Sequence, residues 1–314
     1  MGIEKKNNKT ASAGLLYDIK KYKNVYVLLL PAILLVFVFA YLPMAGIIIA
    51  FQEFDILKGF TGSPWVGFDN FKKIFVRPDM LVAIKNTLIN GIVILFGAFP
   101  FPIILALLFN ELRCMRFKKI VQTITYMPYF LSWISVIGLF YSLLATEGTI
   151  NQILGSIIGE SFKGKNILLD SNYFLPIIFG SHLWKNVGWS SVVFLAAIAG
   201  VDQALYEAAA VDGCGKLRQV FSITIPCIKG TIVIVLIMSL GTLVNANFEQ
   251  VYGLQNIYTQ EATETINTLI YRLGILNGKY SLSTAFGLAQ GLVSLTLMLI
   301  ANGISKKSMG TSIW

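Results

Sequence analysis

The segment Leu205–Pro226 reads LYEAAAVDGCGKLRQVFSITIP and lies between two long apolar blocks. Its first part, Tyr206–Ala210, contains good helix formers, and Gly213 follows as a natural helix end. A second amphipathic run begins at Lys216 and reaches Pro226, which fits the first turn of a following helix. We therefore predict two short helices joined by a glycine turn outside the membrane. Small alanines beside one glutamate would let a partner protein pack closely, although an ordinary Ala-rich connection has the same pattern.

The composition on either side of this segment is that of a membrane protein. The chain has 314 residues, of which 55% are hydrophobic and 13% charged, and the apolar residues come in long blocks. The net charge is +9, and the charged residues lie between these blocks. We therefore attribute the positive charge to membrane topology and expect no nucleic-acid partner. The three cysteines, Cys114, Cys214 and Cys227, do not suit a disulfide framework.

Uncharged blocks predict an all-α polytopic membrane protein with six transmembrane helices. A basic segment, 1–24, precedes the first helix, 25–51, whose apolar core is too long for a signal peptide. An outer loop, 52–85, separates it from a core of five helices, 86–305, and a tail, 306–314, follows. The core blocks are Asn86–Asn110, Ile120–Thr146, Phe174–Gly200, Gly230–Phe248 and Tyr280–Ser305. Both termini then lie on the same side.

The distribution of Lys and Arg predicts which side that is. Fifteen of the 25 lie in the amino terminus, the loops 111–119 and 201–229 and the tail, whereas nine lie in the opposite loops. Positive residues are retained in the cytosol, so both termini and the segment 205–226 are expected there.

Polar residues inside the apolar blocks are candidates for a substrate pathway. Lys185 lies well inside a predicted helix, where a lysine is costly unless it is paired or hydrated. Trp184 and Trp189 flank it, and aromatic faces near polar groups suit sugars. An equally good interpretation places these residues at the membrane interface, with a snorkelling lysine. Further candidates are Asn245, Asn247 and Gln290, although solvated helix ends also explain asparagines of this kind.

The segment 205–226 resembles the cytosolic EAA loop of binding-protein-dependent ABC importer permeases. Matching positions are Glu207, Ala208, Ala209, Asp212, Gly213, Phe221, Ile223 and Pro226, with Ile225 where leucine is common. Further stretches, including VGFDNFKKIF and WKNVGWSSVVFLAAIAGVDQALYEAAAVDG, are similar to carbohydrate permeases of the maltose and glycerol-phosphate type. The carboxy-terminal part looks most like the branch that handles oligosaccharides and polysaccharide fragments.

This resemblance implies a type I ABC importer permease fold with cytosolic coupling helices, in the plasma membrane of a bacterium. It implies four partners: a second permease subunit, expected to be a paralogue, a cytosolic ATPase dimer, an extracellular solute-binding lipoprotein and a carbohydrate substrate. ATP would be hydrolysed by the separate ATPase, so the chain itself is not expected to be an enzyme or to hold a cofactor. The implied ATPase-coupling residues are Glu207, Ala208, Ala209, Asp212, Gly213 and Pro226.

Other functions fit the sequence less well. The same permease architecture could carry a peptide or an organic ion. An intramembrane enzyme would need acidic or histidine residues gathered at one depth, and His182 is the only histidine. That single histidine also argues against a histidine metal cluster or a Ser-His-Asp triad. A secondary transporter is disfavoured because the sequence has no evident inverted repeat or acidic proton relay.

Overall fold

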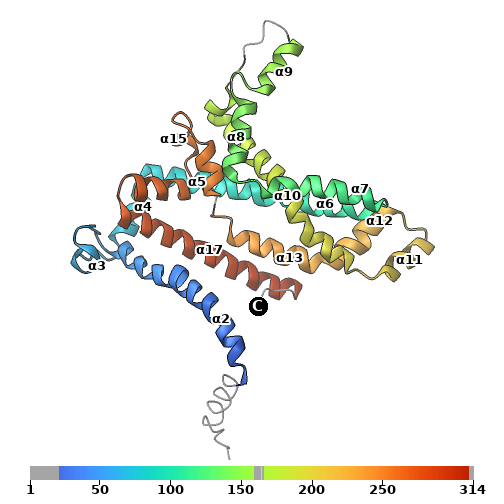
Figure 1. The fold of residues 1–314 in the computed structure, drawn as a ribbon, viewed down its shortest axis with the longest axis horizontal. Helices are drawn as coiled ribbons and strands as arrows, with labels where there is room; N and C mark the ends of the chain where they lie inside the picture. The colour runs from blue at the N-terminus through green and yellow to red at the C-terminus, as the bar shows by residue number, and fades with distance from the viewer. Residues whose placement is uncertain (1–20, 159–163, 165, 246, 311–314) are drawn as a thin grey trace, which may run out of the picture.

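The computed structural model describes residues 21–158, 164, 166–245 and 247–310. Residues 1–20 of the predicted amino-terminal segment and 311–314 of the predicted tail lie outside the described residues. Within the described part the chain is helical, and strand pairing is limited to one isolated antiparallel bridge between Gln52 and Trp65. Figure 1 shows the helices gathered into a bundle.

The first half of the chain contains α2 (Lys23–Val36), η1 (Phe37–Tyr41), η2 (Leu42–Phe51), α3 (Gly59–Gly62), α4 (Asp69–Val76), α5 (Pro78–Ile92), η3 (Val93–Ala98), α6 (Pro100–Glu111), α7 (Met115–Tyr126), η4 (Met127–Phe130), α8 (Trp133–Leu144) and α9 (Thr149–Ile158). The second half contains η5 (Ile167–Leu169), η6 (Ser171–Tyr173), α10 (Phe174–Ala199), α11 (Gln203–Val211), α12 (Lys216–Gln219), η7 (Val220–Thr224), α13 (Ile225–Gly241), α14 (Phe248–Leu254), α15 (Gln260–Thr263), α16 (Ile266–Tyr271), η8 (Arg272–Leu276) and α17 (Tyr280–Met309).

The lengths and apolar character of these helices confirm a polytopic membrane protein. Five helical runs are long and apolar enough to cross a membrane: Lys23–Phe51, Pro78–Glu111, Trp133–Ile158, Lys216–Gly241 and Tyr280–Lys307. A sixth candidate is the pair Ser171–Ala199 and Gln203–Val211, which meets the criterion when the two are taken together and is bent by 71°. The first run leans away from the bundle in Figure 1, and none of its most apolar window is buried within the chain.

Helix boundaries differ from the expected blocks in two places where the chain breaks. The block expected at Ile120–Thr146 contains α7, a short 3-10 turn through Pro128 and, after an extended Leu131, α8. The block expected at Gly230–Phe248 ends as a helix at Gly241, and α14 begins only at Phe248. The expected outer loop 52–85 also contains α3, α4 and the start of α5 at Pro78.

The second expected short helix does not stop before Pro226. Instead, α12 continues through the π-helical turn η7 into α13. A proline inside a helix lacks an N–H and collides with the carbonyl four residues earlier, and a wide π turn just before it relieves both problems. Pro226 accordingly lies in the first turn of α13.

Three apolar clusters hold the bundle together. One joins α10 to α6 and α13 around Phe194, Ile198 and Ile228. A second joins η2, α4 and α5 to α16, η8 and α17 around Met80 and Leu269. The third joins α10 to α14, with α8 packed against it. These contacts place α5–α6, α10 and α13 around a common space.

Candidate functional site

The loop between α10 and α12 is built as an exposed, rigid element. Asp202 accepts a hydrogen bond from the backbone N–H of Ala204 (3.0 Å) and so begins α11. At the other end the N–H of Cys214 bonds to the carbonyl of Ala209 (2.8 Å) and that of Gly213 to Ala210 (3.1 Å). This pair of bonds is a Schellman motif, and Gly213 takes the left-handed conformation it requires, with φ +74°.

Side-chain contacts attach this loop to the membrane helices. The Tyr206 hydroxyl and the Thr224 hydroxyl lie 2.9 Å apart, which ties α11 to η7. Gln219 donates from Nε2 to the carbonyl of Cys214 at 3.1 Å. Lys216 lies 3.7 Å from the carboxylate of Glu111, at the end of α6. These contacts join α11 to η7, directly before α13, and α12 to the end of α6.

The exposed surface of the loop contains both apolar and charged side chains. Val211 is 89% exposed, Leu217 78% and Phe221 68%. Glu207, Ala208, Asp212, Gly213 and Pro226 are also exposed, and Ala209 is half-buried. Exposed apolar side chains gathered beside charged ones mark a surface that packs against another protein.

A cavity of about 270 Å³ lies between η3, α6, α10 and α13. Its polar lining residues are His182, Asn186, Ser190, Ser239, Thr242, Asn245 and Asn247, and Phe99 and Phe194 are among the apolar ones. Asp, Glu, Lys and Arg are absent from the described residues that line it. Amides, hydroxyls and aromatic rings without charge suit a ligand rich in hydroxyl groups.

The wall of this cavity includes the break between α13 and α14. Asn247 caps α14, since its Oδ1 accepts the N–H of Gln250 at 3.3 Å. Gln290 of α17 is only 6% exposed, and its Nε2 lies 2.7 Å from the carbonyl oxygen of Val244, 2.7 Å from Asn245 Oδ1 and 2.8 Å from Asn267 Oδ1. Its two N–H groups are shared among these three oxygens. One amide from the last membrane helix thus holds the non-helical segment in place.

The remaining predicted pathway residues do not line this cavity. Lys185 is buried and points at the break between η4 and α8. Trp189 stacks on Tyr129, with ring centroids 4.9 Å apart, and Trp184 and Trp189 are 41% and 42% exposed. The structure therefore brings Asn245, Asn247 and Gln290 together and places Lys185 and Trp189 beside Tyr129.

Three cavity residues of α10 were not among the predicted site residues. His182, Asn186 and Ser190 follow one another at intervals of four along α10, so they share a face. Asn186 donates from Nδ2 to the carbonyl of His182 at 2.9 Å. Polar residues that recur at every fourth position of an apolar helix were the signal that would have identified them.

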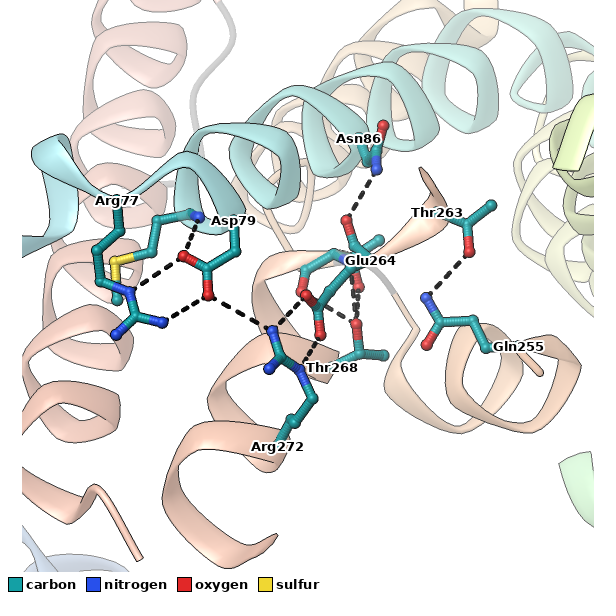
Figure 2. A network of polar contacts seen from close by, with 10 residues as sticks. Arg77, Asp79, Asn86, Gln255, Thr263, Glu264, Thr268 and Arg272 are labelled. Carbon is teal, nitrogen blue, oxygen red and sulfur yellow. Dashed lines mark hydrogen bonds and ion pairs between the residues drawn. The ribbon is translucent and has the colours of Figure 1, made fainter. Parts of the chain in front are cut away.

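A charged network ties α5 to the segment between α14 and α17 (Figure 2). Arg77 forms two hydrogen bonds with Asp79, at 3.1 and 2.7 Å, and Arg272 forms two with Glu264, both at 2.7 Å. Arg272 also lies 3.6 Å from Asp79, which joins the two pairs. Asn86 donates to the carbonyls of Ala262 and Glu264, each at 2.9 Å.

Comparison with known proteins agrees with this arrangement. Residues 81–307 match the family described as the binding-protein-dependent transport system inner membrane component. The chain is 41% identical over 92% of its length to Protein LplB of Bacillus subtilis, and covers 90% of that protein. It is also 41% identical to the polygalacturonan/rhamnogalacturonan transport system permease protein YteP of Bacillus subtilis, over 93% of this chain and 91% of YteP.

Solved structures agree as well. A chain of the bacterial alginate ABC transporter, in complex with an alginate pentasaccharide-bound periplasmic protein, superposes with a TM-score of 0.86. It is 36% identical, and the match covers 95% of this chain and 99% of that chain. These relatives are transport subunits, which confirms that the chain is a permease and not an enzyme. The chain belongs to the family of inner membrane components of binding-protein-dependent transport systems, and is the permease subunit of an ABC importer.

Proposed function

We propose that this permease imports oligosaccharides or polysaccharide fragments. The observation that carries the proposal is the similarity to YteP, which spans more than nine-tenths of both chains and is named for polygalacturonan and rhamnogalacturonan transport. The likeness to the alginate transporter supports it independently. An uncharged cavity lined by amides, hydroxyls and aromatic rings is also consistent with a sugar.

We place Asn245 and Asn247 on the sugar pathway, because both line the cavity and have amide groups that can bond hydroxyls. Gln290 supports the pathway indirectly by holding Asn245. Trp184 and Trp189 remain predicted pathway residues, since each presents about two-fifths of its surface outside this chain. A ring face that is exposed in the single chain is available to a sugar or to a second permease.

We also propose that the loop of α11 and α12 receives the movement of an ATPase dimer. Glu207 would form a charged contact, Ala208 and Ala209 would allow close approach, and Gly213 would hold the turn. Asp212 ends α11 and Pro226 begins α13, so both keep the loop in register with the membrane helix. This role places the loop, and with it both termini, in the cytosol.

The remaining proposed partners are a second permease subunit, a paralogue, and an extracellular solute-binding lipoprotein. The first helical run supports a second subunit, because its apolar window makes no buried contact within this chain. Lipid or a neighbouring helix must cover such a surface. The alginate transporter was solved with a periplasmic protein, which supports delivery of substrate by a binding protein.

ATPase measurements on the reconstituted complex test this function. The complex contains this chain, its second permease and its ATPase, and cognate binding protein is added with a panel of ligands. We expect ATP hydrolysis to rise several-fold with binding protein carrying oligosaccharides of one backbone type, and to remain basal with peptides and organic ions. Stimulation by a peptide or an organic ion, with none by any saccharide, would overturn the sugar assignment while leaving the permease architecture intact.

A further inference from the structure

A buried lysine of α10 lies at the break between η4 and α8. The chain is helical to Phe130 and extended at Leu131, and α8 begins at Trp133. Lys185 is 6% exposed, and its Nζ donates to the carbonyl of Tyr129 at 2.7 Å, to that of Pro128 at 3.4 Å, and to that of Leu131. All three acceptors belong to the backbone at the break.

The carbonyl of Pro128 also accepts the backbone N–H of Leu131 at 3.2 Å, so Lys185 matters most as a donor to the carbonyls of Tyr129 and Leu131. The last carbonyls of a helix have no partner within that helix, and an unsatisfied carbonyl in an apolar bundle costs several kcal/mol, on the order of a lost hydrogen bond or more. An ammonium group has three N–H donors and no acceptor. Three donors therefore meet three acceptors, which leaves the ammonium without a spare N–H for a substrate.

Aromatic rings complete the surroundings of the ammonium. Nζ lies 5.5 Å from the ring centroid of Tyr129 and 5.5 Å from that of Trp133, one on each side of the break. Rings at this distance attract a cation through their electron-rich faces. Lys185 thus forms hydrogen bonds to the backbone of η4, and its ammonium group also attracts one aromatic ring on each side of the break.

The break decides where α8 goes. Both α7 and η4 pack on α10, whereas α8 leaves that direction in Figure 1 and packs against α14. The contact is close: a Cβ added at Gly253 of α14 would lie 2.2 Å from Ile137 Cδ1 of α8. α14 starts directly after Asn247, which lines the cavity. The contact between α8 and α14 therefore connects the break between η4 and α8 to the cavity.

We propose that Lys185 is a positioning residue that fixes the bend between α7 and α8. Through α8 and α14 it holds the segment ending at Asn247, and it does not contact the transported molecule. Only the transport measurement below rests on the proposed function. This role differs from the pathway role that the sequence suggested for Lys185.

Distance measurements between spin labels test the bend directly. The labels are attached to cysteines at Ile120 of α7 and Tyr141 of α8, in a chain whose three native cysteines are replaced. We expect Lys185→Met, which keeps the length of the side chain but removes all three donors, to shift or broaden the distance distribution. Lys185→Arg keeps the charge and the N–H donors and should retain the wild-type distribution.

A matched control is Lys85→Met, which removes an exposed lysine of α5. It should leave the distribution unchanged. If Lys185→Met does not yield folded protein, Lys185→Gln keeps two amide donors and should give a distribution between those of the wild type and a disordered bend. A wild-type distribution in Lys185→Met or Lys185→Gln would overturn the proposal.

Transport kinetics separate positioning from substrate contact. A positioning role predicts that Lys185→Met lowers the maximal binding-protein-stimulated ATPase rate several-fold, and that Lys185→Arg restores it. A direct contact predicts instead a higher ligand concentration for half-maximal stimulation with an unchanged label distance, and that result would contradict the proposal. If the wild-type complex responded to no saccharide, the sugar assignment would fail while the label distances still decided the role of Lys185.

Discussion

Gly213 carries the turn of the loop between α10 and α12, because its φ of +74° is a conformation that residues with a Cβ rarely adopt. A Cβ built there meets no atom within 4 Å, so the expected cost of Gly213→Ala comes from the backbone alone. We expect about 1 kcal/mol of strain in the loop and a several-fold loss of stimulated ATPase activity, with assembly of the permease intact.

The matched control is Gly215→Ala, two residues further on. Gly215 has a φ of −66° and its added Cβ also meets nothing within 4 Å, so alanine fits there. Equal ATPase activity in the two variants would contradict the importance of the left-handed turn.

Gly188 has a different role, since it lets α10 approach α7. A Cβ at this position would lie 2.1 Å from the carbonyl oxygen of Thr125. We expect Gly188→Ala to push the helices apart and to destabilise the protein by about 1–3 kcal/mol, seen as a lower midpoint of thermal unfolding in detergent. Gly180→Ala, in the same helix with open space around the Cβ, should keep the wild-type midpoint. Similar midpoints for both variants would show that the helices do not cross this closely.

At the scale of elements, the non-helical segment between α13 and α14 depends on one amide. The Nε2 of Gln290 lies within hydrogen-bond distance of three oxygens, and Gln290→Leu removes the donor to the buried carbonyl of Val244, at a cost of about 1–3 kcal/mol. We expect a lower midpoint of thermal unfolding and reduced sugar-stimulated ATPase activity. Ser294→Ala is the control on the same helix: the Ser294 hydroxyl is buried with no hydrogen-bond partner, so its loss should be neutral or stabilising. If Gln290→Leu were no more destabilising than Ser294→Ala, the amide would not be holding the segment.

The charged network between α5 and the segment before α17 offers a second comparison. The Glu264 side chain is 6% exposed, and Arg272 is its bidentate partner. Arg272→Gln leaves that charge buried and should cost about 3–5 kcal/mol. Arg77→Gln should cost less, because Asp79 is 28% exposed and keeps Arg272 at 3.6 Å. Thermal unfolding of both variants measures the order, and the reverse order would contradict the buried role of Glu264.

Uncharged blocks located the membrane helices well, but neither break was predicted. Residues 127–132 and 242–247 contain no Asp, Glu, Lys or Arg, so the uncharged blocks run through each break. Carbonyls at the two breaks are satisfied by side chains far away in the sequence, Lys185 and Gln290. Such partners follow from tertiary packing, so a local pattern cannot reveal them. The helix α11 and the turn at Gly213 were predictable because the glycine turn and the helix formers are local.

At the scale of the whole molecule, the predicted orientation places every native thiol on the cytosolic side. Cys114 and Cys227 are exposed and Cys214 is partly so, and Ile257 in the segment before α17 is 83% exposed. In intact cells a membrane-impermeant maleimide should label none of the three, but it should label Ile257→Cys. Permeabilised cells provide the control, since the native thiols should then react. Labelling of Cys214 in intact cells would reverse the orientation.

The absence of formal charge around the cavity bears on the energy of import. A neutral sugar moving past these amides and hydroxyls carries no charge through the transmembrane electric field, so voltage neither helps nor opposes its passage. Each carboxylate on an acidic fragment would instead be driven against an inside-negative potential, at about 2.3 kcal/mol per charge for about 100 mV. The described residues that line the cavity include no Lys or Arg that could compensate such a charge. For acidic cargo, that electrical work would fall on ATP hydrolysis.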